Sequence, residues 1–337
     1  MRVFSDFHHD SLWKSLEYLF EKRLGWELYC PKGLEWFYEG YWKVAEPYQN
    51  CLGTVGQYLG TRGKEPDANG IYQVDGMKGI TLEKFKEMNI DIIIASIPAH
   101  LPTFTKLINE FKPKAKLIFQ IGNEFGPIDF TLAKNILSST SRFEVPRGIN
   151  VVFYHQEFDL DVFNYEPPVK SNLIRSFVHT LPTAGHFQRD WQDFLALEKA
   201  MPEMKFESYG ASCRDGCIDT TKEIARLMKS SLFGFNLKTG GDGFGHIIHN
   251  WFAVGRPVIV RKHQYEGKLA GGLMIDGETC IDLDKRTLEG NAKRIRQFIQ
   301  DEQEYDKTCQ KIRQTFETVV NYDKEFEEIK QFLERLK

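Results

Sequence analysis

Short apolar runs that alternate with segments of helical periodicity constrain the fold of this chain more than any other feature. A continuous apolar run covers residues 90–96, helical spacing follows at 104–111, and another strand-like run covers 116–121. Continuous apolar strands are typical of parallel sheets that helices cover on both faces. The alternation therefore predicts a doubly wound α/β sheet with right-handed crossovers.

The same alternation begins again in the second half of the chain. A polar, proline-rich stretch at residues 164–171 separates the halves and has the composition of an interdomain linker. We therefore expect a Rossmann-like domain over residues 1–168 and a second one over 169–337. In the second half, strands are expected over 173–180, 204–209, 232–236, 257–260, 273–275 and 279–282, and charged amphipathic helices from about 287 to 336.

Residues 31–79 insert a long segment rich in aromatic residues and glycine into the first domain. A loop of this length inside a compact domain is usually functional or carries small elements of its own. Its aromatic side chains either stack on the rings of an acceptor or fill a small core. The sequence leaves both interpretations open.

Polar side chains follow a short β-prone run at residues 2–4, the first expected strand, and the apolar run at 90–96. In an open α/β sheet, the loops at the carboxyl ends of the strands face the ligand. Residues there are candidates for a general base or for hydrogen bonds to a substrate, against the alternatives of a helix-capping loop and a structural histidine. The candidates are Asp6, His8, His9, Asp10 and His100.

A glycine cluster at residues 240–245 precedes a short apolar helix expected over 247–254, and a Gly-Arg-Pro turn ends that helix. Glycine permits positive φ and lets a ligand approach the main chain closely. The first amide groups of a helix lack intrahelical partners and carry partial positive charge. The segment therefore predicts an anion site, above all for phosphate, against the alternative of a flexible glycine turn.

Composition sets limits on the partners. The chain has 337 residues and a net charge of −3, so no global charge favours nucleic acid or an anionic membrane. Its six cysteines contain no Cys-x-x-Cys pair, and no metal site is expected. We expect a cytoplasmic protein, because no apolar run approaches the roughly 20 residues of a membrane span and the start lacks a signal-peptide core.

The glycine segment and its surroundings carry a resemblance to a known family. Residues 242–245 read Asp-Gly-Phe-Gly, Asn250 follows at the spacing of a second acidic position, and 255–259 read Gly-Arg-Pro-Val-Ile. This pattern resembles the signature of the large retaining family of GT-B glycosyltransferases usually numbered four. That family has glutamate at both positions where this chain has Asp242 and Asn250. Residues 155–163 also resemble the connection that joins its domains.

The resemblance implies a fold and an activity. A GT-B enzyme has two doubly wound Rossmann-like domains that face a cleft, with C-terminal helices. Here the first would bind the acceptor and the second a nucleotide sugar, UDP- or GDP-linked, as co-substrate without a cofactor or metal. Transfer would go to a saccharide or other hydroxyl acceptor with retention of configuration. An inverting enzyme would need a base, for which Asp6, His8 or Asp10 are candidates.

The resemblance also implies residue roles. Arg189 and Lys238 would bind the diphosphate, whose charge grows as the leaving group departs. Asp242 would accept hydrogen bonds from the transferred sugar, Asn250 would face the ribose, and His100 would contact the donor sugar. The remaining candidates for donor binding are Gly241, Gly243, Phe244, Gly245 and His246.

Two other functions stay open. The altered carboxylates also suit a GT-B protein that binds a nucleotide or glycan without transfer. The aromatic insert also suits a phage-type transferase that modifies hydroxymethylated DNA, although the acidic net charge disfavours nucleic acid. A Rossmann dehydrogenase is disfavoured, because residues 5–10 contain no glycine.

Overall fold

The chain is described by a computed structural model, and all structural statements concern the residues whose placement it fixes. His8, His9 and Gly241 lie outside the described residues, as does most of the aromatic insert, so their expected roles stay predictions. Asp10 is described as the first residue of a helix. The described ranges are 1–6, 10–31, 65–74, 77–96, 98–122, 128–218, 220–239 and 242–336.

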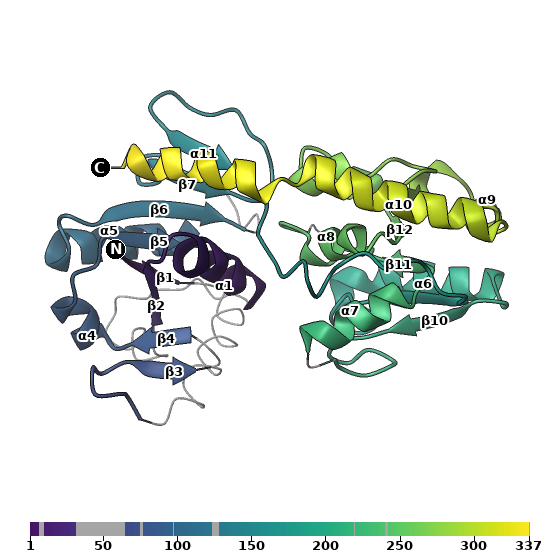
Figure 1. Cartoon of the computed structure of the whole chain (residues 1–337), viewed down its shortest axis with the longest axis horizontal. Helices are drawn as coiled ribbons and strands as arrows, with labels where there is room; N and C mark the ends of the chain where they lie inside the picture. Colours follow the sequence, from purple (N-terminus) through teal and green to yellow (C-terminus); the bar gives the residue numbers. More distant parts are fainter. Residues whose placement is uncertain are drawn as a thin grey trace. The chain divides into compact units, whose positions relative to one another are not determined.

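The chain forms two compact units (Figure 1). The first comprises Met1–Phe158 together with Tyr322–Lys337, and the second comprises Asp159–Asn321. The chain thus leaves the first unit before the boundary expected near residue 168. Its last helix, α11 (Tyr322–Glu334), belongs to the first unit, whereas the second domain was expected to run from 169 to 337.

The first unit is built on a sheet whose described strands run in the order β3-β4-β2-β1-β5-β6-β7-β8. All neighbours are parallel except β3 and β4. The sequence pattern missed β7, because only its two central residues are aliphatic. The strands are β1 (Arg2–Ser5), β2 (Glu27–Pro31), β3 (Tyr72–Val74), β4 (Met77–Ile80), β5 (Ile92–Ala95), β6 (Lys116–Ile121), β7 (Asn135–Ser138) and β8 (Asn150–Phe153).

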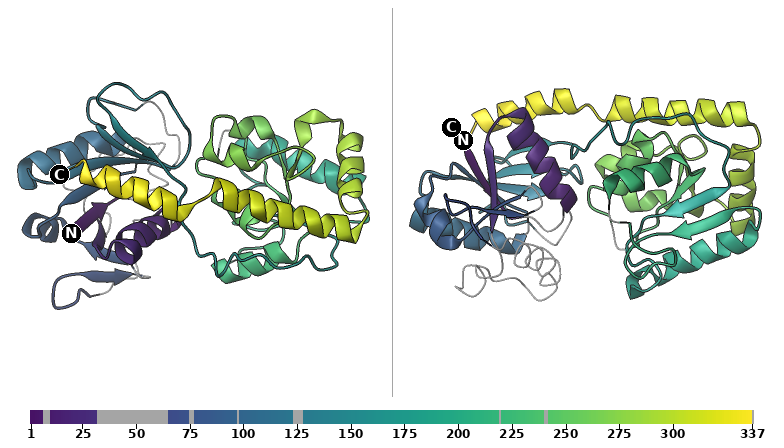
Figure 2. Two further views of the ribbon diagram at one scale, coloured as in Figure 1. Left: turned by 45° about the horizontal axis from the view of Figure 1, so that its top comes forward. Right: turned by 60° about the horizontal axis from the view of Figure 1, so that its bottom comes forward.

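Helices cover both faces of this sheet. Helix α1 (Asp10–Glu17) continues as a π-helical turn over Tyr18–Arg23. Apolar residues of α1 and α11 pack on one face, and Figure 2 shows these two helices on that same side. The opposite face packs against α4 (Leu82–Glu87) and α5 (Leu101–Phe111). The faces alternate along each strand, as pleating requires.

The second unit is a smaller, wholly parallel sheet in the order β10-β9-β11-β12-β13. The expected strand over 273–275 is wrong: Leu273 ends a 3₁₀ helix (Leu269–Leu273), and Met274 and Ile275 belong to no strand. The strands are β9 (Leu173–Ser176), β10 (Lys205–Ser208), β11 (Phe233–Phe235), β12 (Val258–Val260) and β13 (Cys280–Asp282). The helices are α6 (Gln188–Ala200), α7 (Thr221–Lys229), α8 (His246–Ala253), α9 (Leu288–Phe298) and α10 (Glu302–Val319).

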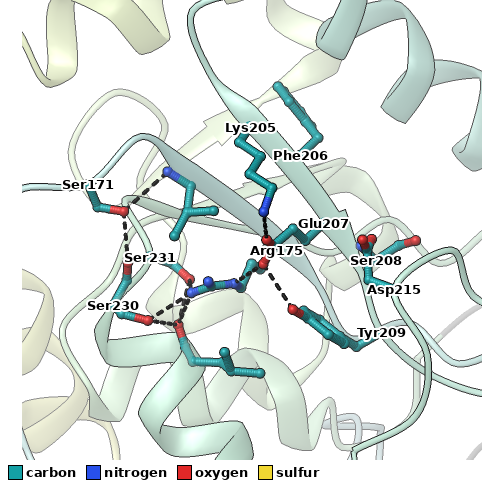
Figure 3. A network of polar contacts seen from close by, with 12 residues as sticks. Ser171, Arg175, Lys205, Phe206, Glu207, Ser208, Tyr209, Asp215, Ser230 and Ser231 are labelled. Atoms are coloured by element: carbon teal, nitrogen blue, oxygen red, sulfur yellow. Dashed lines mark hydrogen bonds and ion pairs between the residues drawn. The ribbon is translucent and has the colours of Figure 1, made fainter.

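A buried ion pair joins the first two strands of this unit (Figure 3). Arg175 Nε of β9 lies 2.6 Å from Glu207 Oε2 of β10, and Arg175 Nη1 also donates to the Leu227 carbonyl oxygen of α7 at 2.7 Å. Burial alone would raise the pKa of Glu207, but hydrogen bonds from Lys205, Arg175 and Tyr209 lower it to about 2. The pair therefore ties α7 to the sheet.

None of the helices in the described residues is long and apolar enough to cross a lipid bilayer. The longest, α10, carries charged residues along its length.

Candidate functional site

The strand order of the second unit reverses between β9 and β11. From β9 the chain moves to β10 on one side of the sheet, and β11, β12 and β13 lie on the other side. In open α/β sheets, ligands bind outside the carboxyl ends of the strands at such a reversal. The segments that leave β9 and β11 lead into α6 and α8, so both helix N-termini belong to the candidate site.

These two helix starts differ from the others in the unit. A 3₁₀ turn over Gly185–Phe187 leads directly into α6, and neither its N-cap residue Ala184 nor Gly245, the N-cap of α8, makes a side-chain capping hydrogen bond. By contrast, α7, α9 and α10 are capped by side chains of Thr220, Thr287 and Asp301. A side-chain cap satisfies an N–H group that an anion would otherwise bind. The two helices at the reversal are thus left able to receive an anion.

Asp242 is held by three partners inside the unit. Its Oδ1 lies 2.8 Å from Lys238 Nζ, its Oδ2 accepts from Tyr265 Oη at 3.3 Å, and its main-chain oxygen accepts from Lys268 Nζ at 2.6 Å. Burial and the charge of Asp242 raise the pKa of Tyr265 well above its usual value, so this phenol stays a donor. The expected diphosphate cation Lys238 and the expected sugar-binding carboxylate therefore form an ion pair.

A clamp joins the two helix starts. The buried carboxylate of Asp190, on the first turn of α6, accepts from Thr239 N at 2.6 Å and from Thr239 Oγ1 at 2.7 Å. Arg189 precedes Asp190 and Lys238 precedes Thr239, so the clamp brings together the segments that carry the two expected diphosphate cations. Arg189 is exposed and has no partner among the described residues.

Gly245 shapes the start of α8. It adopts φ of 74°, the left-handed conformation that glycine tolerates best, and a Cβ there would lie 3.4 Å from Asp242 Oδ2. Its carbonyl oxygen lies 2.9 Å from His249 Nδ1, and the His249 ring stacks on Phe244 with 4.0 Å between centroids. Phe244 is buried, whereas Gly243 and His246 are partly exposed. Phe244 therefore supports the loop from within.

Asn250 presents a buried acceptor. It is 7% exposed, and its Oδ1 has no hydrogen-bond partner among the residues that the structure describes. Leaving a buried polar group unpaired costs about 1–3 kcal/mol, so such atoms mark places where a ligand or water donates. The sequence resemblance had singled out Asn250, but not that its acceptor atom lacks a donor.

In the first unit, Asp6 and His100, for which separate roles were expected, form a hydrogen-bonded pair. The strand order reverses between β1 and β5, and Asp6 and Ser96 directly follow these strands. Asp6 Oδ1 accepts from Ser96 N at 2.5 Å, and its Oδ2 pairs with His100 Nδ1. Asp6 and His100 are both fully buried. Both carboxylate oxygens of Asp6 are used inside the protein, and one of them orients the imidazole of His100. The expected acceptor-side role of Asp6 stays a prediction.

Sequence reasoning missed several members of these sites. Asp190, Tyr265, Lys268 and Ser96 were not singled out, although the contacts above depend on them. The rule that parallel strands end at the ligand edge could have indicated Ser96, because it follows an apolar strand. The clamp of Asp190 on Thr239 spans the two loops and has no local signal.

Comparisons with known proteins identify the architecture. No protein-family model matches the chain, and no curated protein sequence does. Solved structures match over nearly its whole length. Anabaena Alr3699/HepE in complex with UDP-glucose aligns with a TM-score of 0.63 at 12% identity, covering 99% of both chains.

Two further solved structures agree. Sucrose-phosphate synthase from Thermosynechococcus elongatus gives 0.61 at 13% identity, covering 99% of this chain and 98% of that one. An alpha-glucosyltransferase in complex with UDP and a 13-mer DNA containing a HMU base gives 0.62 at 13% identity, covering 98% and 99%. With its two doubly wound units and C-terminal helices, the chain has the GT-B fold.

Proposed function

We propose that this protein is a glycosyltransferase that moves a sugar from a nucleotide-sugar donor to a hydroxyl acceptor. The observation that carries the proposal is the strand reversal of the second unit. There, two helices without side-chain caps meet Arg189, the Lys238–Asp242 pair and the unpartnered acceptor of Asn250. A diphosphate, a sugar and a ribose together need anion-binding amides, cations and hydroxyl-binding oxygens.

UDP is the nucleotide that we favour. Solved structures with the same fold contain UDP or UDP-glucose, and all align over nearly the whole chain. The diphosphate would lie against the start of α8 with Arg189 and Lys238 as its cations. The Asn250 oxygen would accept from a ribose hydroxyl, which would satisfy an atom that is otherwise unpaired.

Both members of the Lys238–Asp242 ion pair would bind the donor. Lysine carries three N–H donors, so its ammonium group can keep Asp242 and still donate to a diphosphate oxygen. Asp242 would use its remaining lone pairs for hydroxyls of the transferred sugar. The same ammonium would then stabilise the charge that grows on the leaving diphosphate.

We infer retention of configuration from the resemblance to the retaining family. The acceptor oxygen would bond to the anomeric carbon on the face from which the diphosphate leaves, as the bond from that carbon to the phosphate oxygen breaks. The acceptor proton would pass to the departing phosphate oxygen. His100, oriented by Asp6, would contact the donor sugar and would not need to act as a base.

A thermal-shift screen against UDP, GDP and their sugar conjugates tests the proposal. A ligand at about 100 times its Kd stabilises the folded state by roughly 2.7 kcal/mol, so a true donor raises the Tm measurably. Lys199→Ala is a matched control, because Lys199 is an exposed cation at the other end of α6 from Arg189. No shift with any of these nucleotides would contradict the proposal.

Two outcomes would favour the other functions. Binding of UDP-glucose without hydrolysis or transfer to any acceptor would indicate a non-catalytic GT-B protein. Transfer to hydroxymethylated DNA, with strongly salt-dependent binding, would indicate a DNA-modifying enzyme like the alpha-glucosyltransferase solved with DNA.

A further inference from the structure

Tyr265 contacts the glycine segment from another part of the chain. It is the last residue of a 3₁₀ helix (Lys262–Tyr265) that follows β12, and it is completely buried. Its hydroxyl oxygen lies 3.3 Å from Asp242 Oδ2, and a Cβ on Gly245 would lie 3.7 Å from its ring atom Cε1. Tyr265 therefore contacts the segment at two positions just before α8 begins.

The neighbours of the Tyr265 hydroxyl decide where its proton points. Asn236, which follows β11, donates from Nδ2 to Tyr265 Oη at 2.8 Å, so the oxygen is an acceptor on that side. A phenol has one O–H donor, and Asp242 Oδ2 is the acceptor beside it. Burial and the charge of Asp242 raise the pKa of Tyr265 well above its usual value, so the proton is retained. The phenol therefore donates to Asp242.

Two lysines hold Asp242 as well. Lys238 Nζ lies 2.8 Å from Asp242 Oδ1, and Lys268 Nζ donates to the Asp242 main-chain oxygen at 2.6 Å. Each carboxylate oxygen thus accepts from one protein group. An ionised carboxylate has about four acceptor sites, so lone pairs on both oxygens remain for a ligand. The Asp242 side chain is only 10% exposed, so its orientation decides which lone pairs a ligand can reach.

We propose that Tyr265 is a positioning residue for the transferred sugar, which it orients through Asp242. The inference rests on the proposed function and adds a residue beyond the pattern at 242–259 that resembles the family signature. A phenylalanine would fill the same space without burying a polar group, so packing alone does not account for the hydroxyl. UDP lacks the transferred sugar, so the hydroxyl should contribute to binding a UDP-sugar and not to binding UDP.

Titration of the full chain with UDP and with UDP-glucose tests this difference. Tyr265→Phe keeps the ring beside Gly245 and removes only the hydroxyl. It should weaken UDP-glucose binding about ten-fold and leave the UDP affinity within about two-fold of wild type. If the thermal-shift screen selects GDP, then GDP and GDP-mannose replace the two probes.

Tyr305→Phe is the matched control. Tyr305 is a second buried tyrosine of the same unit, and its hydroxyl donates to the carbonyl oxygen of Leu232, which precedes β11. Each variant leaves one buried partner without its hydrogen bond, so both should lower the Tm to a similar degree. Only Tyr265→Phe should change the affinity for UDP-glucose.

A double-mutant cycle shows whether Tyr265 acts through Asp242. Asp242→Asn alone should weaken UDP-glucose binding, because an amide accepts at one atom only. Adding Tyr265→Phe should then cause little further loss, since the carboxylate that the phenol orients is already gone. A role of Tyr265 in packing alone would make the two losses add.

Three outcomes overturn the inference. The first is an equal loss of UDP and UDP-glucose affinity in Tyr265→Phe, which would show that the hydroxyl only stabilises the fold of the segment. The second is an unchanged UDP-glucose affinity in that variant, and the third is additive losses in the double variant. If neither UDP nor GDP binds to the wild type, the proposed function is contradicted instead.

Discussion

The strand order reverses in the sheets of both units, but the side chains at the two reversals differ in charge and in exposure. In the second unit the reversal is lined by cations, uncapped helix starts and a glycine loop, with Arg189 and Lys238 partly or fully exposed. In the first unit, the groups at the reversal and along the neighbouring strand ends are buried, and Asp6 with His100 supplies the ionisable pair. In the function that we propose, the fold sets where a ligand binds, and the side chains at each reversal decide which ligand it is.

The largest effect is expected from removing both cations of the second unit. Each charge-assisted hydrogen bond to a phosphate contributes about 2 kcal/mol, so Arg189→Ala with Lys238→Ala should weaken UDP binding roughly 1000-fold. Titration calorimetry measures this loss. An affinity within about three-fold of wild type would show that the diphosphate does not bind at this reversal.

The next effect concerns the first unit alone. Asp6→Asn should lower the transfer rate about 100-fold, because the amide no longer fixes the His100 tautomer by accepting from Nδ1. UDP affinity should stay unchanged, since we propose that the nucleotide binds the second unit. Measuring kcat and the UDP Kd on the same preparation distinguishes this from a general loss of folding. An unchanged kcat would leave Asp6 with a structural role only.

The Arg175–Glu207 pair should make the stability of the second unit sensitive to acid. The pKa of Glu207 is lowered to about 2 in the folded state, so its contribution is present above its ordinary unfolded pKa near 4.5 and is lost as pH falls toward 2. That contribution is about 3 kcal/mol, and Glu207→Gln should remove it and flatten the pH dependence of unfolding between pH 4.5 and 2. Chemical denaturation at pH 7 and pH 3 measures both. An equal pH slope in wild type and variant would refute this account of the Arg175–Glu207 pair.

The smallest effect is expected at Asn250. Asn250→Leu removes a buried oxygen that lacks a partner, so the free protein should keep its Tm or gain slightly. UDP binding should weaken about five- to ten-fold, the value of one hydrogen bond to a ribose hydroxyl. Asn291→Leu is the contrasting variant, because Asn291 Nδ2 donates to the Leu283 carbonyl oxygen and its loss should lower Tm without affecting UDP.

The sequence predicted the sheets better than the sites. The apolar run at 116–121 coincides with β6, and both doubly wound units were expected from the alternation. The course of the tail was not, since nothing local distinguishes α11 from α10, although only α11 packs on the first unit. The pattern of a charged amphipathic helix predicts that one of its faces packs against the protein, but it does not predict against which unit.

Sequence reasoning identified candidate residues more readily than it identified the contacts between them. Asp6 and His100 were both predicted, yet their contact depends on the register of β1 against β5, in which Ser5 pairs with Ile94. Periodicity does not specify that register.

Incubation of the full chain with UDP-glucose and a neutral disaccharide, followed by proton NMR of the anomeric region, tests the central claim most directly. The account predicts that the UDP-glucose anomeric signal decays, that free UDP appears, and that the new glycosidic signal has the small coupling constant of a retained α linkage. Donor cleavage should stop in Arg189→Ala with Lys238→Ala and continue in Lys199→Ala. If neither UDP-glucose nor another UDP- or GDP-sugar is cleaved or transferred, the glycosyltransferase proposal is contradicted.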